Sequence, residues 1–204
     1  MGGSVACLWG TMVPRDAVLE AELAGGIVLL DVSHLLPVAH GKRYASRPMS
    51  GIVRQYHHHS GAMGRPGFAG ALGTARYVVA EHGWAGAAYH YFLSHVADRD
   101  YSDRIVVYRL QQDIVRSYHT GGDANTHGIG VCWQGDLTTV EPSSDQIEAA
   151  EALIPWLLGR HAGMQMDPCP ISWHSESARW GGSGKPTCPG PHVEAWLAAY
   201  REAT

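Results

Sequence analysis

The sequence contains no apolar run that approaches the roughly 18 residues needed to cross a membrane. It has no excess of basic residues either, because 15 Lys and Arg stand against 19 Asp and Glu and the net charge is −4. This balance disfavours a protein that binds nucleic acid. The first residues lack a basic segment followed by an apolar core, so we expect neither a signal peptide nor a membrane span.

Cysteine is also scarce. The four thiols are widely spaced, at Cys7, Cys132, Cys169 and Cys188. In a chain without an export signal we expect them to be reduced. Histidine, by contrast, occurs thirteen times, which raises the question of a metal site. The 204 residues, 45% hydrophobic and 17% charged, are enough for one globular domain with an apolar core.

Hydrophobic patterning predicts the secondary structure. Apolar runs indicate strands at 27–32, 51–60, 86–93, 105–110 and 128–135. Helical patterns cover 16–26, 68–82, 143–161 and 191–203. Ser143 and Gln146 have the spacing of a capping box, and Pro155 should bend the helix that follows. This order of elements predicts an α/β domain with a mixed central β-sheet flanked by helices.

One loop-like stretch, ISWHSESARWGGSGKPTCPG at 171–190, combines His174, Lys185 and Cys188. Histidine and cysteine thiolate are both good zinc ligands, but two ligands do not hold a zinc ion. A third ligand must come from elsewhere. Otherwise His174 is an ordinary surface or core residue, and Cys188 is a buried thiol or the disulfide partner of Cys169.

The most suggestive source of a third ligand is the histidine run that ends the predicted strand at 51–60. The alternation of side chains along a strand places His57 and His59 on one face and His58 on the other. Only one face can point toward a shared ion, and the pattern alone leaves open which one does. A solvated strand end is the alternative interpretation of the run.

Four blocks in order carry a family resemblance: IVRQYHHHSG, GWAGAAYHYFL, NTHGIGVCWQGDL and ISWH…KPTCPG. Together they resemble the zinc-dependent N-acetylmuramoyl-L-alanine amidases of the peptidoglycan-recognition (amidase type 2) family, and most of all the phage endolysin members. The resemblance implies the fold of that family, with a zinc amidase catalytic domain at 45–204. Residues 1–44 have no counterpart, and we predict an N-terminal extension of unknown role.

The resemblance assigns the ligands of one Zn²⁺ ion to His58, His174 and Cys188. It assigns a catalytic role to Tyr89, which follows Ala88 where many members have glycine. The family's catalytic lysine or threonine precedes the third ligand. Here Lys185 lies three positions before that ligand, where many members have it two before, and Thr187 lies next to it. Both remain candidates.

Other family positions are less constrained. Some relatives carry a glutamate at the position of Cys132, so this chain lacks that acid. We predict substrate-binding roles for Trp84, His90, His119 and Asn125. The alternatives are a packed tryptophan, buried histidines and, for Asn125, a turn residue.

The implied activity is hydrolysis of the amide bond between N-acetylmuramic acid and L-alanine in bacterial peptidoglycan. We expect a phage endolysin, monomeric, held in the host cytoplasm until a holin-type pore releases it to the cell wall. The alternatives are a peptidoglycan-binding module without catalysis and a cytosolic amidase that acts on soluble muropeptides. A further regulatory protein partner and the type of stem peptide are left open by the sequence.

Overall fold

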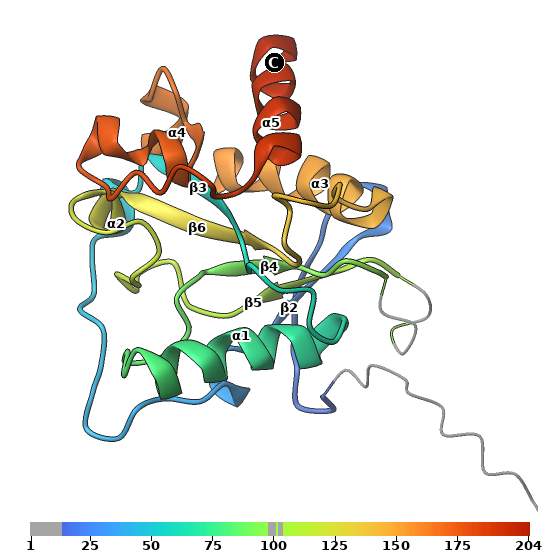
Figure 1. Ribbon diagram of the computed structural model, residues 1–204, viewed down its shortest axis with the longest axis vertical. Coiled ribbons are helices and arrows are strands. Elements are labelled where there is room, and N and C mark those ends of the chain that lie inside the picture. Colours follow the sequence, from blue (N-terminus) through green and yellow to red (C-terminus); the bar gives the residue numbers. More distant parts are fainter. Residues whose placement is uncertain (1–13, 98–100, 102–103) are drawn as a thin grey trace, which may run out of the picture.

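The computed structural model describes residues 14–97, 101 and 104–204, and its centre is a seven-stranded sheet (Figure 1). The strands are β1 Val18–Glu22, β2 Val28–Asp31, β3 Arg54–His59, β4 Tyr91–Leu93, β5 Val106–Arg109, β6 Gly128–Trp133 and β7 Ile171–Trp173. The helices are α1 Gly67–Glu81, α2 Ala124–His127, α3 Ser144–Arg160, α4 Ala162–Met166 and α5 Pro191–Ala203. This arrangement confirms the predicted fold class.

The sheet is mixed, in the order β1-β2-β5-β4-β6-β3-β7. At one end β4, β6, β3 and β7 are parallel neighbours, while β5 is antiparallel to β4 and β1 is antiparallel to β2. Parallel strands end at the same edge of a sheet, so the residues that follow β3 and β7 emerge side by side.

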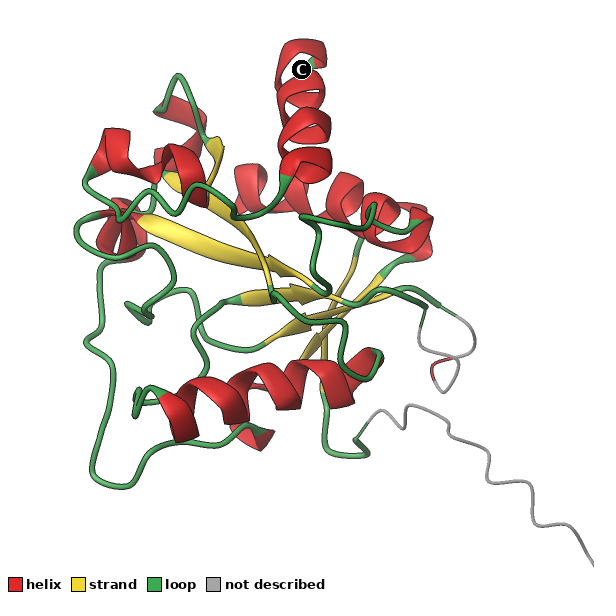
Figure 2. Cartoon of the chain, in the orientation of Figure 1, coloured by secondary structure: helices red, strands yellow, loops and turns green. Residues whose placement is uncertain are grey.

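Helices cover both faces of the sheet (Figure 2). One apolar core lies between the sheet and α3 and α5, and includes Trp133, Leu153 and Leu197. The second lies on the α1 side and includes Ala71 and Phe92. No helix in the described ranges is long and apolar enough to span a membrane.

Helix α3 begins with the predicted capping box. The Ser143 hydroxyl accepts a hydrogen bond from the Gln146 N–H, and the Gln146 side chain accepts one from the Ser143 N–H, both at 3.2 Å. The helix continues through Pro155 to Arg160. The helix therefore tolerates the proline, which is itself exposed, while Leu153, Ile154 and Leu157 pack into the core.

The helix predicted at 16–26 is wrong. Residues 18–22 form β1, and a short 3₁₀ turn, Ala24–Gly26, leads into β2. The Leu23 N–H donates to the Ile27 carbonyl at 2.8 Å, and Gly25 adopts φ 70° inside this hairpin turn. The local pattern is compatible with a helix, but pairing with β2 overrides this weak preference. The strand predicted at 86–93 is also shorter than expected, because only 91–93 pair as β4.

Candidate metal centre

His58 and His174 come from neighbouring parallel strands. His57 on β3 lies opposite Trp173 on β7, so the next residues of the two strands, His58 and His174, are also neighbours. His57 points to the opposite face, where its Nδ1 accepts a hydrogen bond from Trp133 Nε1 at 2.9 Å. The alternation predicted for the histidine run is therefore present, and it separates His58 from His57.

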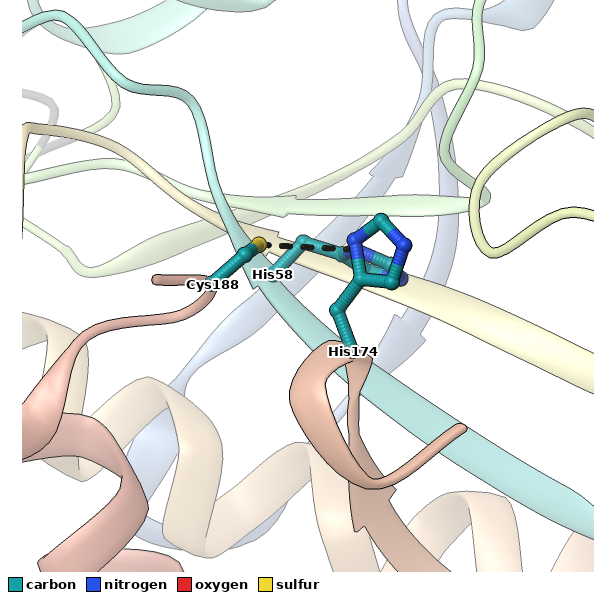
Figure 3. A group of neighbouring side chains, drawn as sticks. All are labelled: His58, His174 and Cys188. Carbon is teal, nitrogen blue, oxygen red and sulfur yellow. Dashed lines mark hydrogen bonds between the residues drawn. The ribbon is translucent and has the colours of Figure 1, made fainter. Parts of the chain in front are cut away.

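Cys188 completes the group from the loop before α5 (Figure 3). The Nδ1 atoms of His58 and His174 are 3.1 Å apart, and Cys188 Sγ lies 3.8 Å from His58 Nδ1. All three ligand atoms lie within 4.8 Å of one another. A tetrahedral ion with bond lengths typical of zinc would place its nitrogens about 3.3 Å apart and each nitrogen about 3.6 Å from the sulfur. The three residues fit such an ion and could hold a metal.

The protein environment keeps these groups uncharged. Burial, with a contribution from neighbouring histidines, holds the pKa of His58 well below its usual value. Burial, together with the charges of Lys185 and His59, lowers the pKa of His174 to about 4. Burial also raises the pKa of the Cys188 thiol to about 11. Neutral imidazoles are the form that binds a cation, and a bound cation would displace the thiol proton.

A cavity of about 900 Å³ lies beside the three residues. Its wall combines α1, the 59–65 segment and the loop that carries Lys185. Four of the residues predicted to act on substrate line it, namely Trp84, Tyr89, His119 and Lys185. The structure thus brings the candidate metal ligands and these four side chains to one place.

Tyr89 lies against the candidate centre, with its ring centroid 5.1 Å from that of His58. Burial raises the pKa of its phenol well above 10, so the hydroxyl is a neutral hydrogen-bond donor. Lys185 is exposed, and its positive charge adds to the lowering of the His174 pKa and partly offsets the rise that burial causes in the Cys188 pKa.

Three predicted residues are placed differently. Thr187 is exposed and is not among the described residues that line the cavity. His90 is fully buried, with Nδ1 accepting from the Gly130 N–H and Nε2 at 2.9 Å from the Val115 carbonyl oxygen. Asn125 Oδ1 accepts from three successive backbone N–H groups, those of residues 119–121. The last two side chains therefore hold backbone segments in place.

Sequence reasoning missed most of an aromatic row on the cavity wall, formed by Tyr77, His82, Trp84 and Tyr118. Successive ring centroids are 5.2, 5.1 and 5.9 Å apart. Tyr77 and Tyr118 are 58% and 44% exposed. The available signal was Tyr77 on the polar side of α1, but sequence spacing alone does not link it to Tyr118, about forty positions away.

Comparisons with known proteins agree with this fold. The family model for N-acetylmuramoyl-L-alanine amidases (Amidase_2) matches residues 46–191. The ectodomain complex of peptidoglycan recognition proteins LCa and LCx, solved with bound tracheal cytotoxin, is 18% identical, with a TM-score of 0.66 over 84% of this chain and 95% of the other. Drosophila PGRP-LB is 17% identical, with a TM-score of 0.63 over 85% and 94%.

A bacterial neighbour has the same fold. The endolysin N-acetylmuramoyl-L-alanine amidase LysCS from Clostridium intestinale URNW is 15% identical, with a TM-score of 0.59 over 85% of this chain and 95% of the other. A search of curated protein sequences finds no match. Because the family model covers well over half of the sequence, the chain belongs to the N-acetylmuramoyl-L-alanine amidase family of the amidase type 2 class.

Proposed function

We propose that this protein is a zinc-dependent N-acetylmuramoyl-L-alanine amidase that hydrolyses the bond between N-acetylmuramic acid and L-alanine in peptidoglycan. The observation that carries the proposal is the convergence of His58, His174 and Cys188 beside a cavity, in a chain of this family. Two imidazoles and one thiolate leave one position of a tetrahedral ion open, as in catalytic zinc sites.

Bound zinc would supply a Lewis acid and bring the pKa of a water molecule close to 7. Tyr89 and Lys185 stabilise the charge that develops on the substrate. The neutral Tyr89 phenol donates a hydrogen bond to the lactyl carbonyl oxygen as that atom gains negative charge. The Lys185 ammonium stabilises the same charge electrostatically. We favour Lys185 over Thr187 because only Lys185 is among the described cavity residues.

The cavity also suggests how the substrate lies. The lactyl carbonyl must reach the centre, so the glycan and the stem peptide extend along the cavity wall. Trp84 and the rest of the aromatic row offer flat apolar faces to the substrate, and His119 closes the wall near His58. We assign His90 and Asn125 indirect roles, since they hold the backbone around the site.

For the biological role, we propose a phage endolysin. The family resemblance of the sequence blocks favours it, and one structural neighbour is titled an endolysin. In this proposal the enzyme acts as a monomer on the cell wall and stays in the host cytoplasm until a holin-type pore releases it.

The test is mass spectrometry of the fragments released from purified sacculi, with and without a zinc chelator. We expect new L-alanine amino termini and intact glycan, both abolished by the chelator and by His174→Ala, which should also lose zinc. Intact sacculi in the presence of zinc-loaded protein would contradict a wall amidase. Binding to those sacculi would then indicate a binding module, and cleavage of soluble muropeptides alone would indicate an enzyme of small fragments.

A further inference from the structure

We propose that His119 and Ser183 are positioning residues that present the two histidine ligands to the metal. His119 contacts the outer nitrogen of His58, and Ser183 contacts the outer nitrogen of His174. The inference rests on the proposed function, because it assumes that zinc binds at this centre. It assigns His119 a role different from contact with substrate, and it gives Ser183 a role that no sequence pattern indicated.

The tautomer of His58 follows from a chain of hydrogen bonds. His119 Nε2 lies 3.1 Å from the Gly128 carbonyl oxygen, which can only accept, so Nε2 carries the proton. Because burial favours a neutral ring, His119 Nδ1 is then an acceptor. That Nδ1 lies 3.2 Å from His58 Nε2, which must therefore donate. The remaining nitrogen of His58, Nδ1, is left with a free lone pair.

The nitrogen of His58 that keeps its lone pair is the one nearest the other two candidate ligands. Nδ1 is the atom that lies 3.1 Å from His174 Nδ1 and 3.8 Å from Cys188 Sγ. A backbone carbonyl thus fixes the orientation of a ligand through one intervening ring. Partners of this kind, which bind the second nitrogen of a metal-bound histidine, fix its tautomer and raise its basicity.

Ser183 serves His174 in a different way. Its hydroxyl oxygen lies 2.7 Å from His174 Nε2, and a hydroxyl can either donate or accept. Without metal, His174 Nδ1 can keep its proton and donate to His58 Nδ1, while Ser183 donates to Nε2. With metal on Nδ1, the proton must reside on Nε2, and the hydroxyl rotates to accept it. Ser183 therefore satisfies His174 in both states.

The two partners belong to loops that are locked together. The Ser183 N–H donates to the Thr120 carbonyl at 2.6 Å, and the Asp123 N–H donates to the Gly181 carbonyl at 3.1 Å. A Cβ on Gly122 would lie 1.9 Å from the Gly181 carbonyl oxygen, so only glycine permits this contact. This close approach of the two loops fixes the position of His119 relative to Ser183.

The experiment measures zinc affinity in the full-length protein by competition with a chromogenic chelator at neutral pH. Ser183→Ala and His119→Phe each remove the outer partner, and we expect each to weaken zinc binding roughly 10- to 100-fold. Ser183→Thr keeps the hydroxyl and should bind within about threefold of wild type. Ser144→Ala, on the exposed start of α3, is the matched control and should leave affinity unchanged.

The melting temperature of the metal-free variants separates positioning from folding, because a purely structural role would lower it without a specific loss of zinc. If His119→Phe does not fold, His119→Leu, which has no hydrogen-bonding atom to offer His58, takes its place. Wild-type affinity in Ser183→Ala or in the folded His119 variant would overturn the inference alone. A wild-type protein that binds no zinc would overturn both the inference and the proposed function.

Discussion

Among single residues, Lys185 and Thr187 differ in their position relative to the cavity. Both precede Cys188, but only Lys185 lines the space beside the centre. We therefore expect Lys185→Ala to lower kcat on sacculi about 100-fold, the effect typical of losing one group that stabilises an oxyanion. Thr187→Ala is the matched variant and should stay within about threefold of wild type. Zinc content, measured alongside, should be unchanged in both; a rate loss confined to Thr187→Ala would reverse the assignment.

The same scale shows how far single residues could be predicted. Strand alternation separated His58 from His57, and the structure confirms two faces. Side-chain type and motif order pointed to the group that includes His174 and Cys188. Ser183 could not be predicted, because its contact with His174 depends on the conformation of a loop rich in glycine and serine. Such loops have no periodicity from which contacts can be inferred.

Among the elements, the longer strands and helices of the region that matches the family were predicted, whereas the short helices α2 and α4 and the strand β1 were not. Buried runs such as 128–135 are apolar enough to identify a strand, and the capping box marked the start of α3. β1 has the composition of an amphipathic helix, and its strand conformation depends on pairing with β2. β4 is short because residues 86–90 form bends and loop rather than a paired strand, although the His90 N–H still donates to the Gly130 carbonyl of β6. Tyr89, in this segment, lies against His58.

A buried charge cluster connects β1 to the rest of the domain. Asp113 is 1% exposed and accepts from the Tyr91 hydroxyl at 2.7 Å and from Arg160 Nε at 2.9 Å. It also pairs with Arg109 at 3.0 Å, and Arg109 in turn pairs with Glu20 on β1. The cluster thus joins three strands, β1, β4 and β5, to the end of α3.

Replacing Asp113 with Asn should destabilise the protein by about 3 kcal/mol, because it leaves buried arginine charge without its partner. Burial opposes the carboxylate, but hydrogen bonding from His161 and the charge of Arg109 outweigh it and hold the Asp113 pKa well below its usual value. The carboxylate therefore stabilises the fold above pH 4 and loses this effect as pH falls further. Urea denaturation at neutral pH measures the loss, and Asp145→Asn, on the first turn of α3, serves as a comparison.

An unchanged urea midpoint in Asp113→Asn would mean that the cluster contributes nothing net to stability. It would also remove the argument that β1 is held by charge as well as by strand pairing.

At the scale of the whole molecule, the described N-terminal residues and the region that matches the family model form one sheet. β2 pairs with β5 in parallel register, so described residues before position 45 contribute to the same sheet as β3 and β6. The boundary at residue 44 and the function of the extension stay predictions. The arrangement shows a structural contribution of β1 and β2, which lie at the sheet edge opposite to β7 and the candidate ligand His174 that follows it.

The molecule also buries several neutral histidines, which makes its stability depend on pH. Burial lowers the pKa of His57 to about 3, and burial together with the charge of Arg47 lowers that of His90 to about 3. The unfolded chain binds protons at these sites near pH 6.5, whereas the folded protein does not until pH 3. Stability therefore falls as pH drops below 6.5, and each such histidine costs about 2 kcal/mol between pH 7 and pH 5.

His90→Asn tests this dependence away from the candidate ligands, because the asparagine Oδ1 takes the place of Nδ1 as the acceptor from the Gly130 N–H. The absolute stability of the variant matters less than its slope. From urea denaturation at several pH values, we expect the loss between pH 7 and pH 5 to be about 2 kcal/mol smaller than in wild type. The exposed residue His40 supplies the control, since His40→Gln should reproduce the wild-type slope. Parallel slopes in all three proteins would show that His90 takes up a proton in the folded state near pH 6, and that its buried contacts rearrange to accommodate the charge.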